Sequence, residues 1–260
     1  MSYPGSALLF AVGLTAVALT APALGGSAHT AAVQAPGAVV HKSQSSAIDH
    51  LLPTDRKAHK GANNSWGGYA VTGSTYHAVT GDWTVPALDC SATAGDISFW
   101  SGLDGWTSSS VEQIGLDAVC TKSGAIQYNP WVEMYPANSI YFTETVKAGD
   151  QMTSSVTTNG SGSFTLVLAD PTQGWTKTYT KTAKSVALSS AEVIVEAIGS
   201  QTIPPCPNFH QIQFTDVTAD GTPFASAGTV NTTNLERSGT LLTQDGTLSG
   251  TSFPVTWLHA

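Results

Sequence analysis

Apolar and acidic side chains alternate along the stretch Ala191-Glu192-Val193-Ile194-Val195-Glu196. Residues two apart share one face of a β-strand, so Val193 and Val195 point one way, while Glu192, Ile194 and Glu196 point the other way. The pattern predicts a strand that packs on an apolar core with one face. The other face presents two carboxyl groups.

Short runs of strand character fill the chain from residue 64 onward. They are rich in Val, Ile, Thr, Tyr and Trp, are separated by Gly, Asp, Asn and Pro, and leave almost no stretch of helical period. This pattern predicts an all-β sandwich or barrel. The expected strands cover residues 64–72, 77–85, 96–103, 110–116, 126–135, 151–157, 163–170, 176–182, 191–198 and 209–217.

Charged residues make up only 11% of the 260-residue chain, well below the roughly 25% of ordinary soluble domains. With few ion pairs, the protein has little stability to lose in acid. Residues 61–260, which we expect to form one domain, contain six Lys and Arg against sixteen Asp and Glu. This negative charge argues against a nucleic-acid partner.

The N-terminal residues have the pattern of an export signal. An apolar run from Ala7 to Leu19 precedes the small residues Ala21-Pro22-Ala23, and the run is too short to span a bilayer. We therefore expect residues 1–23 to be a signal peptide. The product is expected to be secreted and extracellular, with no membrane partner.

Residues 24–60 are interpreted as a pro-segment or a linker. The part from residue 27 to residue 60 carries four Lys and Arg against two Asp and Glu, and it holds four of the seven His. Acid charges the His and neutralises carboxylates, which weakens attraction to the acidic domain. The hypothesis is an inhibitory pro-segment that is released at low pH, and a disordered linker is the alternative.

Three cysteines in an exported chain allow one disulfide and one remaining thiol. Cys90 and Cys120 flank a stretch with several strand signals. We therefore favour a bond between these two, which leaves Cys206 free.

The motifs of common hydrolases are absent from the sequence. It contains no Gly-x-Ser-x-Gly, no His-Glu-x-x-His and no Asp-Thr-Gly or Asp-Ser-Gly pair. Residues 61–260 hold three His, namely His77, His210 and His259, which weakens serine, cysteine and zinc mechanisms together. Carboxyl and amide side chains remain as candidates, and no metal or other cofactor is expected.

Two further strands place polar side chains on one face. Trp131, Glu133 and Tyr135 alternate with Val132 and Met134, so the first three are expected to line a groove. In the second strand Val111, Gln113 and Gly115 share a face. Gly115 is expected to leave room for a substrate backbone beside Gln113.

Several blocks, in order along residues 65–217, resemble the glutamic peptidase (eqolisin) family. They are Ser65-Trp66-Gly67-Gly68-Tyr69-Ala70, Gly81-Asp82-Trp83-Thr84-Val85-Pro86, Phe99-Trp100-Ser101-Gly102-Leu103-Asp104-Gly105, Val111-Glu112-Gln113-Ile114-Gly115-Leu116-Asp117, Tyr128-Asn129-Pro130-Trp131-Val132-Glu133-Met134-Tyr135-Pro136 and Ala191-Glu192-Val193-Ile194-Val195-Glu196. The resemblance implies an antiparallel, lectin-like jelly-roll β-sandwich with a concave substrate cleft.

The resemblance also implies roles for individual residues. It places the catalytic amide at Gln113 and the catalytic carboxyl at Glu196, the second acid of its block. The positions that line or support the substrate cleft are Trp66, Trp100, Asp104, Glu133 and Tyr135.

A Gln and Glu pair suits the hydrolysis of peptides in acid. An ionised Glu196 takes a proton from water, and the Gln113 amide holds the water and the developing oxyanion. A carboxyl base stays partly ionised in mild acid, where a His base is lost. We therefore expect a monomeric acid endopeptidase that acts on polypeptides.

Two other functions fit the same β-sandwich. A retaining glycoside hydrolase places two carboxyls about 5–5.5 Å apart on the concave face of a jelly roll, and Glu133 with Glu196 could form such a pair. A lectin-like protein would bind glycans through its aromatic side chains without turnover. Neither alternative accounts for the blocks around Gln113 and Trp66.

Overall fold

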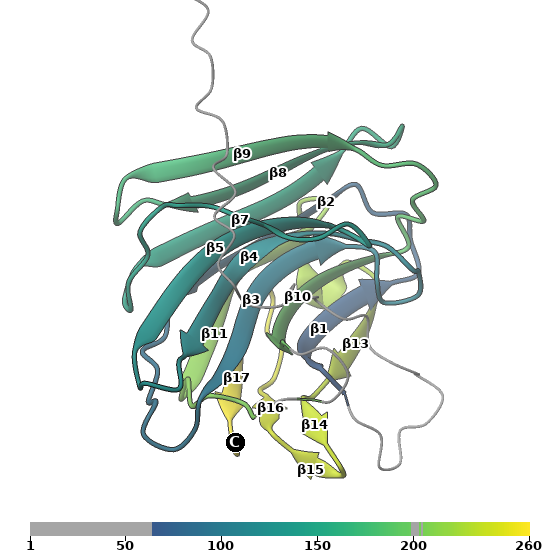
Figure 1. Ribbon diagram of the computed structural model, residues 1–260. Coiled ribbons are helices and arrows are strands. Elements are labelled where there is room, and N and C mark those ends of the chain that lie inside the picture. The colour runs from purple at the N-terminus through teal and green to yellow at the C-terminus, as the bar shows by residue number, and fades with distance from the viewer. Residues whose placement is uncertain (1–63, 199–202, 204) are drawn as a thin grey trace, which may run out of the picture. The chain divides into compact units, whose positions relative to one another are not determined.

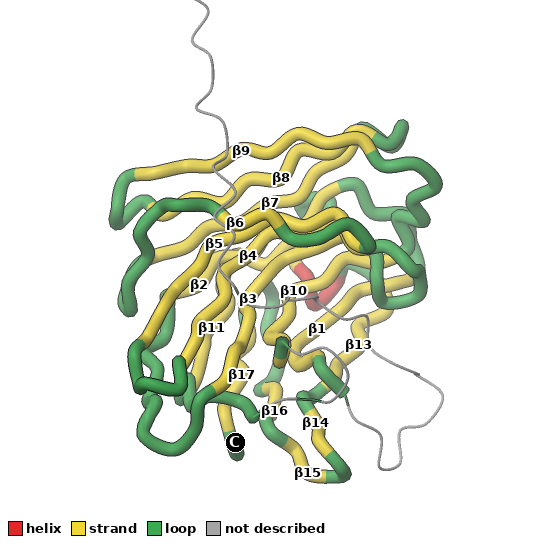
Figure 2. The backbone as a smooth tube through the Cα atoms, in the orientation of Figure 1, coloured by secondary structure: helices red, strands yellow, loops and turns green. Residues whose placement is uncertain are grey.

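The computed structural model describes residues 64–198, 203 and 205–260, and within them two antiparallel sheets carry nearly all of the regular structure (Figure 1, Figure 2). The first sheet has the order β13-β1-β10-β3-β4-β5-β6. Its strands are β1 (Trp66–Thr72), β3 (Gly95–Leu103), β4 (Val111–Cys120), β5 (Ile126–Tyr135), β6 (Ile140–Tyr141), β10 (Ser190–Ala197) and β13 (Thr229–Thr233).

The second sheet has the order β16-β17-β11-β2-β7-β8-β9, and β12 pairs with β11. Its strands are β2 (Ala78–Thr84), β7 (Gln151–Thr158), β8 (Ser163–Asp170), β9 (Trp175–Thr182), β11 (Gln211–Ala219), β12 (Thr222–Pro223), β16 (Thr243–Asp245) and β17 (Phe253–Trp257). A small hairpin of β14 (Glu236–Arg237) and β15 (Thr240–Leu241) and one 3-10 turn, η1 (Phe224–Ser226), complete the described residues.

The main core lies between the two sheets and is built by strand alternation. Val193 and Val195 of β10 belong to this core, together with Ile114 and Leu116 of β4. The predicted orientation of these strands is thus confirmed. A second, smaller apolar cluster lies on the other face of the first sheet and contains Trp66, Trp100, Val111, Trp131 and Ile194.

All ten predicted strands are present, with ends that differ by a few residues, and the antiparallel β-sandwich is confirmed. The prediction missed β6 and all strands after residue 220. Those strands are two to five residues long, too short to establish an alternation.

Cys90 and Cys120 form the predicted disulfide, with their Cα atoms 5.4 Å apart. Cys206 is free and buried, also as predicted. Burial raises the pKa of its thiol to about 12, so the thiol stays protonated and unreactive.

The predicted signal peptide and most of the predicted pro-segment fall in residues 1–63, outside the described residues. Within residues 64–198, 203 and 205–260, no helix has the length and apolar character needed to cross a membrane.

Candidate active site

Strand pairing in the first sheet aligns side chains of its outer face in three rows. The amide row crosses four neighbouring strands. Its members, in strand order, are Glu192 of β10, Gly102 of β3, Gln113 of β4 and Glu133 of β5. Two residues further along the strands is the aromatic row of Ile194, Trp100, Gly115, Trp131 and Tyr141. Two residues beyond that is the acceptor row of Glu196, Ser98 and Asp117.

The amide of Gln113 is held by its neighbour on β5. Its Nε2 donates to Oε2 of Glu133 at 2.5 Å, and the Ser139 hydroxyl donates to the other oxygen of Glu133 at 3.0 Å. Gln113 is only 1% exposed, and its Oε1 is buried without a hydrogen-bond partner. A buried amide oxygen of this kind is suited to receive a hydrogen bond from a water or a substrate.

Gly102 keeps the space between Gln113 and Glu192 open. A Cβ at Gly102 would lie 3.1 Å from Cβ of Gln113 and 3.0 Å from Cζ3 of Trp100. Because one strand separates β4 from β10, the Cα atoms of Gln113 and Glu192 are about 10 Å apart. Two extended side chains together reach roughly 10 Å, so this pair can share a small molecule between them.

Glu192 is fully buried and is positioned by the segment that follows β3. The backbone N–H of Trp106 donates to its Oε1 at 3.2 Å. Glu192 was recognised from the sequence as an acid on the open face, without a catalytic role. The alternation could not select between two acids four residues apart, because both point to the same side.

Glu196 does not lie beside Gln113. It shares the outer face with Gln113 but stands two rows and two strands away in the register. Its Oε2 accepts a hydrogen bond from Nε1 of Trp100 at 3.0 Å, and the residue is 1% exposed. The strand register puts Glu192 in the amide row and Glu196 in the acceptor row, both on the same outer face as Gln113.

The predicted cleft residues Trp66 and Trp100 are buried and pack edge to face, with ring centroids 4.9 Å apart and planes at 77°. Tyr135, another predicted cleft residue, is half-buried and packs against the same apolar cluster, as do Trp106 and Tyr141. These three partly exposed rings are the outermost members of the cluster around the amide row.

Asp104, also predicted to line or support the cleft, holds a loop in place. It is fully buried, with a φ of 66°, and its carboxylate accepts hydrogen bonds from three successive N–H groups at 2.8–3.0 Å. The donors are Ala187, Leu188 and Ser189, directly before β10. Asp104 thus supports the strand that carries Glu192 and lines no cleft itself.

Glu112 is a buried carboxyl that belongs to the opposite side of β4. Burial, and then the nearby Asp104 carboxylate, raise its pKa to about 8. Glu112 alternates with Gln113, so it faces away from the amide row. Glu112 therefore affects how the stability of the fold depends on pH, and it is not part of the candidate active site.

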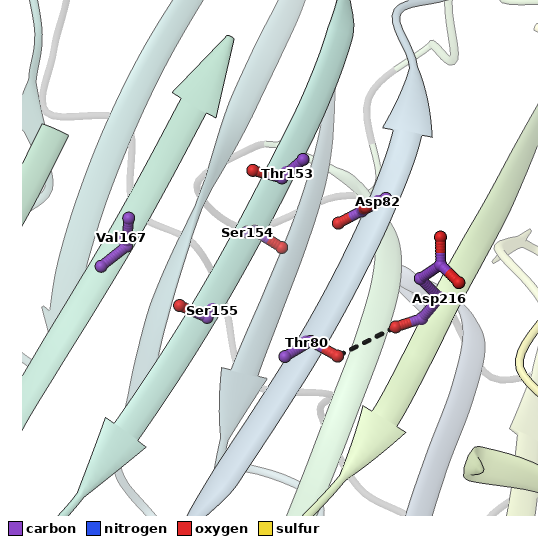
Figure 3. Close-up of a pocket in the computed structure, with 7 residues that line it drawn as sticks. All are labelled: Thr80, Asp82, Thr153, Ser154, Ser155, Val167 and Asp216. Carbon is purple, nitrogen blue, oxygen red and sulfur yellow. Dashed lines mark hydrogen bonds between the residues drawn. The ribbon is translucent and has the colours of Figure 1, made fainter. Parts of the chain in front are cut away.

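A separate cavity of about 350 Å³ lies on the outer face of the second sheet (Figure 3). It is lined by Thr80, Asp82, Thr153, Ser154, Ser155, Val167 and Asp216. Burial, and then the Asp216 carboxylate, raise the pKa of Asp82 to about 6. None of the amide-row residues belongs to this cavity, and within the described residues no group of three or more His, Cys, Asp or Glu could hold a metal ion.

Comparisons with known proteins agree on one family. The model of the Peptidase A4 family matches residues 64–257. Aspergillopepsin-2 of Aspergillus niger is 27% identical over 222 residues, which cover 75% of this chain and 78% of that protein.

Solved structures of two peptidases are similar to this one. Scytalido-glutamic peptidase with a peptide-based transition-state analogue has a TM-score of 0.64 and 26% identity, covering 75% of this chain and 98% of its own. The aspergilloglutamic peptidase of Aspergillus niger has a TM-score of 0.56 and 27% identity, covering 63% of this chain and 99% of its own.

Proposed function

Because the chain belongs to the Peptidase A4 family and is a glutamic endopeptidase, we propose that Gln113 and Glu196 are its catalytic dyad. The observation that carries this proposal is that both side chains are buried on the outer face of the first sheet, where Oε1 of Gln113 has no partner and the Trp100 indole holds Glu196. The substrates are polypeptides, and the working pH is acidic.

In the proposed reaction a water lies between Oε1 of Gln113 and the ionised carboxylate of Glu196. Glu196 takes one proton from the water, and the water oxygen bonds to the carbonyl carbon of the scissile peptide. The carbonyl π electrons move to its oxygen. The amide N–H of Gln113 that Glu133 does not occupy stabilises the resulting oxyanion.

Breakdown of this tetrahedral intermediate needs a proton on the departing nitrogen. Glu196 now carries that proton and delivers it as the C–N bond breaks, so that its carboxylate is restored. The products are a carboxylic acid and an amine. A carboxyl group can serve as base and then as acid in this way at an acidic pH, where His is permanently charged.

Glu133 is proposed to fix the orientation of the Gln113 amide. Its Oε2 accepts a hydrogen bond from Nε2 of Gln113 at 2.5 Å. This bond directs Oε1 of Gln113 toward the water position. Trp106, Tyr135 and Tyr141 are partly exposed at the edge of the buried cluster. We propose that the substrate approaches the amide row past these three rings.

The test of the dyad is turnover of an acid-denatured protein by single variants. Glu196→Gln and Gln113→Ala should each lower kcat by at least about 1000-fold, while the unfolding midpoint in urea stays close to that of the wild type. Substantial cleavage by a folded Glu196→Gln variant would exclude Glu196 as the base. Release of reducing sugar from xylan would instead support the glycoside hydrolase alternative.

We also propose that the enzyme is secreted and that residues 24–60 form an inhibitory pro-segment. The apolar run at Ala7–Leu19 supports export. The net positive charge of residues 27–60 and the net negative charge of residues 61–260 support an inhibition that weakens in acid. N-terminal sequencing of the protein from the culture medium tests both. A mature N-terminus far from residue 60 would argue against the pro-segment.

A further inference from the structure

Glu133 accepts a hydrogen bond on each of its two carboxylate oxygens. Oε2 accepts from Nε2 of Gln113 at 2.5 Å, and Oε1 accepts from the Ser139 hydroxyl at 3.0 Å. Glu133 is only 3% exposed, so protein groups rather than bulk water determine how its carboxylate is oriented. The carboxylate thus joins the Gln113 amide to the segment that follows β5.

The pairing of β5 with β6 explains why Ser139 reaches Glu133. In this pairing Ile140 of β6 lies opposite Val132 of β5. The next position of the antiparallel register sets Ser139 opposite Glu133. Ser139 therefore extends the amide row by one position, toward the edge of the first sheet.

The half-buried Ser139 is held in place by contacts on both sides of it in the chain. Before it, the N–H of Ala137 closes an exposed turn onto the carbonyl of Met134 at 2.9 Å. After it, the Tyr141 hydroxyl donates to Asp117 of β4 at 2.7 Å. Neither contact involves the Ser139 side chain, so a substitution there can remove the hydroxyl without moving the segment.

Ser98, in the acceptor row, provides a contrast on the same face of the sheet. Its Oγ accepts a hydrogen bond from Nε1 of Trp131 at 3.1 Å and so holds an aromatic ring. The Ser139 hydroxyl donates instead to a carboxylate, and hydrogen bonds to carboxylates are among the stronger ones in proteins. That carboxylate in turn holds the Gln113 amide.

We propose that Ser139 is a positioning residue for the reaction and acts through Glu133 on the Gln113 amide. This inference rests on the proposed role of Gln113 in the catalytic dyad. The Ser139 hydroxyl fixes the plane of the Glu133 carboxylate, and the carboxylate then fixes the direction of the Nε2–H bond. Oε1 of Gln113 is thereby directed toward the water position.

The need for a second donor follows from the flexibility of the Glu side chain. Its last torsion has a broad, roughly two-fold energy profile, so one hydrogen bond leaves the carboxylate plane poorly fixed. Without the Ser139 hydroxyl, the Glu133 carboxylate can turn about its Cγ–Cδ bond, and the amide that it holds gains freedom with it. An error of about 1 Å in the placement of a catalytic group costs up to about 100-fold in rate.

The test compares Ser139→Ala, which removes the hydroxyl, with Ser139→Thr, which keeps it. Ser139→Ala should lower kcat about 10-fold or more while KM changes less than about 2-fold, because the hydroxyl acts on Gln113 and not on the substrate. Ser139→Thr should keep kcat within about 3-fold of the wild type. Ser226→Ala, which removes a hydroxyl bonded to the carbonyl of Pro223, is the control for loss of a hydroxyl elsewhere. Urea unfolding checks that each variant is folded.

The side-chain amide of Gln113 reports the effect directly. In ¹H–¹⁵N spectra of protein labelled at the Gln side chains, Gln113→Ala identifies the Gln113 signals by their disappearance. These signals should shift in Ser139→Ala and keep their positions in Ser139→Thr. In a Glu133→Ala background, Ser139→Ala should lower kcat no further, because the carboxylate through which the hydroxyl acts is already absent.

The outcomes separate this inference from the dyad itself. Wild-type kcat in Ser139→Ala, or unchanged Gln113 signals in that variant, would overturn the inference and leave the dyad in place. An equal further loss of kcat in the Glu133→Ala background would also overturn it, since the hydroxyl would then act by another route. Substantial turnover by folded Gln113→Ala would instead refute the dyad, whatever the Ser139 variants show.

Discussion

Gln113 and Glu133 lie directly opposite each other on β4 and β5, and the Gln113 amide donates to Oε2 of Glu133 at 2.5 Å. An amide has two N–H groups and one carbonyl oxygen, so this bond determines which way each of them points. One N–H is occupied, and the oxygen is left buried without a partner. The orientation of the proposed catalytic amide is therefore set by Glu133 on the neighbouring strand β5.

Replacement of Glu133 by Ala should lower kcat about 10- to 100-fold, because the Gln113 amide can then rotate. Glu133→Gln keeps a carbonyl oxygen that can accept from Nε2, and it should recover most of the loss. Steady-state kinetics on a peptide substrate at acidic pH provide the measurement. Equal activity of Glu133→Ala and wild type would show that the amide needs no support.

Replacement of Gly102 by Ala should lower kcat/KM at least about 10-fold. The new methyl group would lie 3.0–3.1 Å from Trp100 and Gln113, closer than ordinary van der Waals contact, so at least one of them must move. Thermal unfolding of the variant provides the stability control. Wild-type kinetics in Gly102→Ala would mean that catalysis does not depend on the positions of Trp100 and Gln113 beside Gly102.

Stability should decrease as the pH rises from about 4.5 to about 8. The folded-state pKa of Glu112 is about 8, above its value of 4.5 in an unfolded chain, so the folded protein binds more protons within this window. The stabilisation by the protonated Glu112 carboxyl is complete below the unfolded-state pKa of 4.5. It is lost as the pH rises through the folded-state pKa of about 8. The raised pKa values of Asp245, about 7, and Asp82, about 6, act in the same direction.

Glu112→Gln tests this account, because it resembles the protonated carboxyl at every pH. Relative to the wild type, it should retain about 2–4 kcal/mol more of its unfolding free energy at pH 8 while differing little at pH 4. Urea unfolding at the two pH values measures the difference. Parallel loss of stability in both proteins would contradict the assignment to Glu112.

Removal of the Cys90–Cys120 disulfide should cost about 3–4 kcal/mol of stability, as expected for a closed loop of some 30 residues. The double variant Cys90→Ser/Cys120→Ser should therefore unfold at lower urea concentration. Thiol titration of the denatured, unreduced wild-type protein should find one thiol, that of Cys206. Three thiols would show that the bond does not form.

Strand periodicity predicted the β-sandwich and the faces of β4, β5 and β10, because a period of two is a local property of the sequence. It could not choose between Glu192 and Glu196, because their side chains point the same way, and only the family resemblance selected Glu196. The row of each acid follows from the pairing of β10 with β3, which joins residues 88 to 100 positions apart. No local pattern records that pairing.

The contributions of Tyr141, Ser98 and Asp117 were missed for the same reason. No local sequence pattern marks any of the three. Each takes part in a hydrogen bond whose partner lies on another strand. The family resemblance predicted that Asp104 lines or supports the cleft. The loop that its carboxylate binds lies more than 80 residues further on, which no local pattern shows.

Asp104 fixes the segment directly before β10. Its carboxylate accepts hydrogen bonds from three consecutive backbone N–H groups there, and its backbone N–H donates to the carbonyl of Ser190 at 3.0 Å. The exposed residues just upstream, Lys184 and Ser185, are not held by this carboxylate. Insertions, deletions or tags at these two residues should therefore leave β10, with both Glu192 and Glu196, in its place.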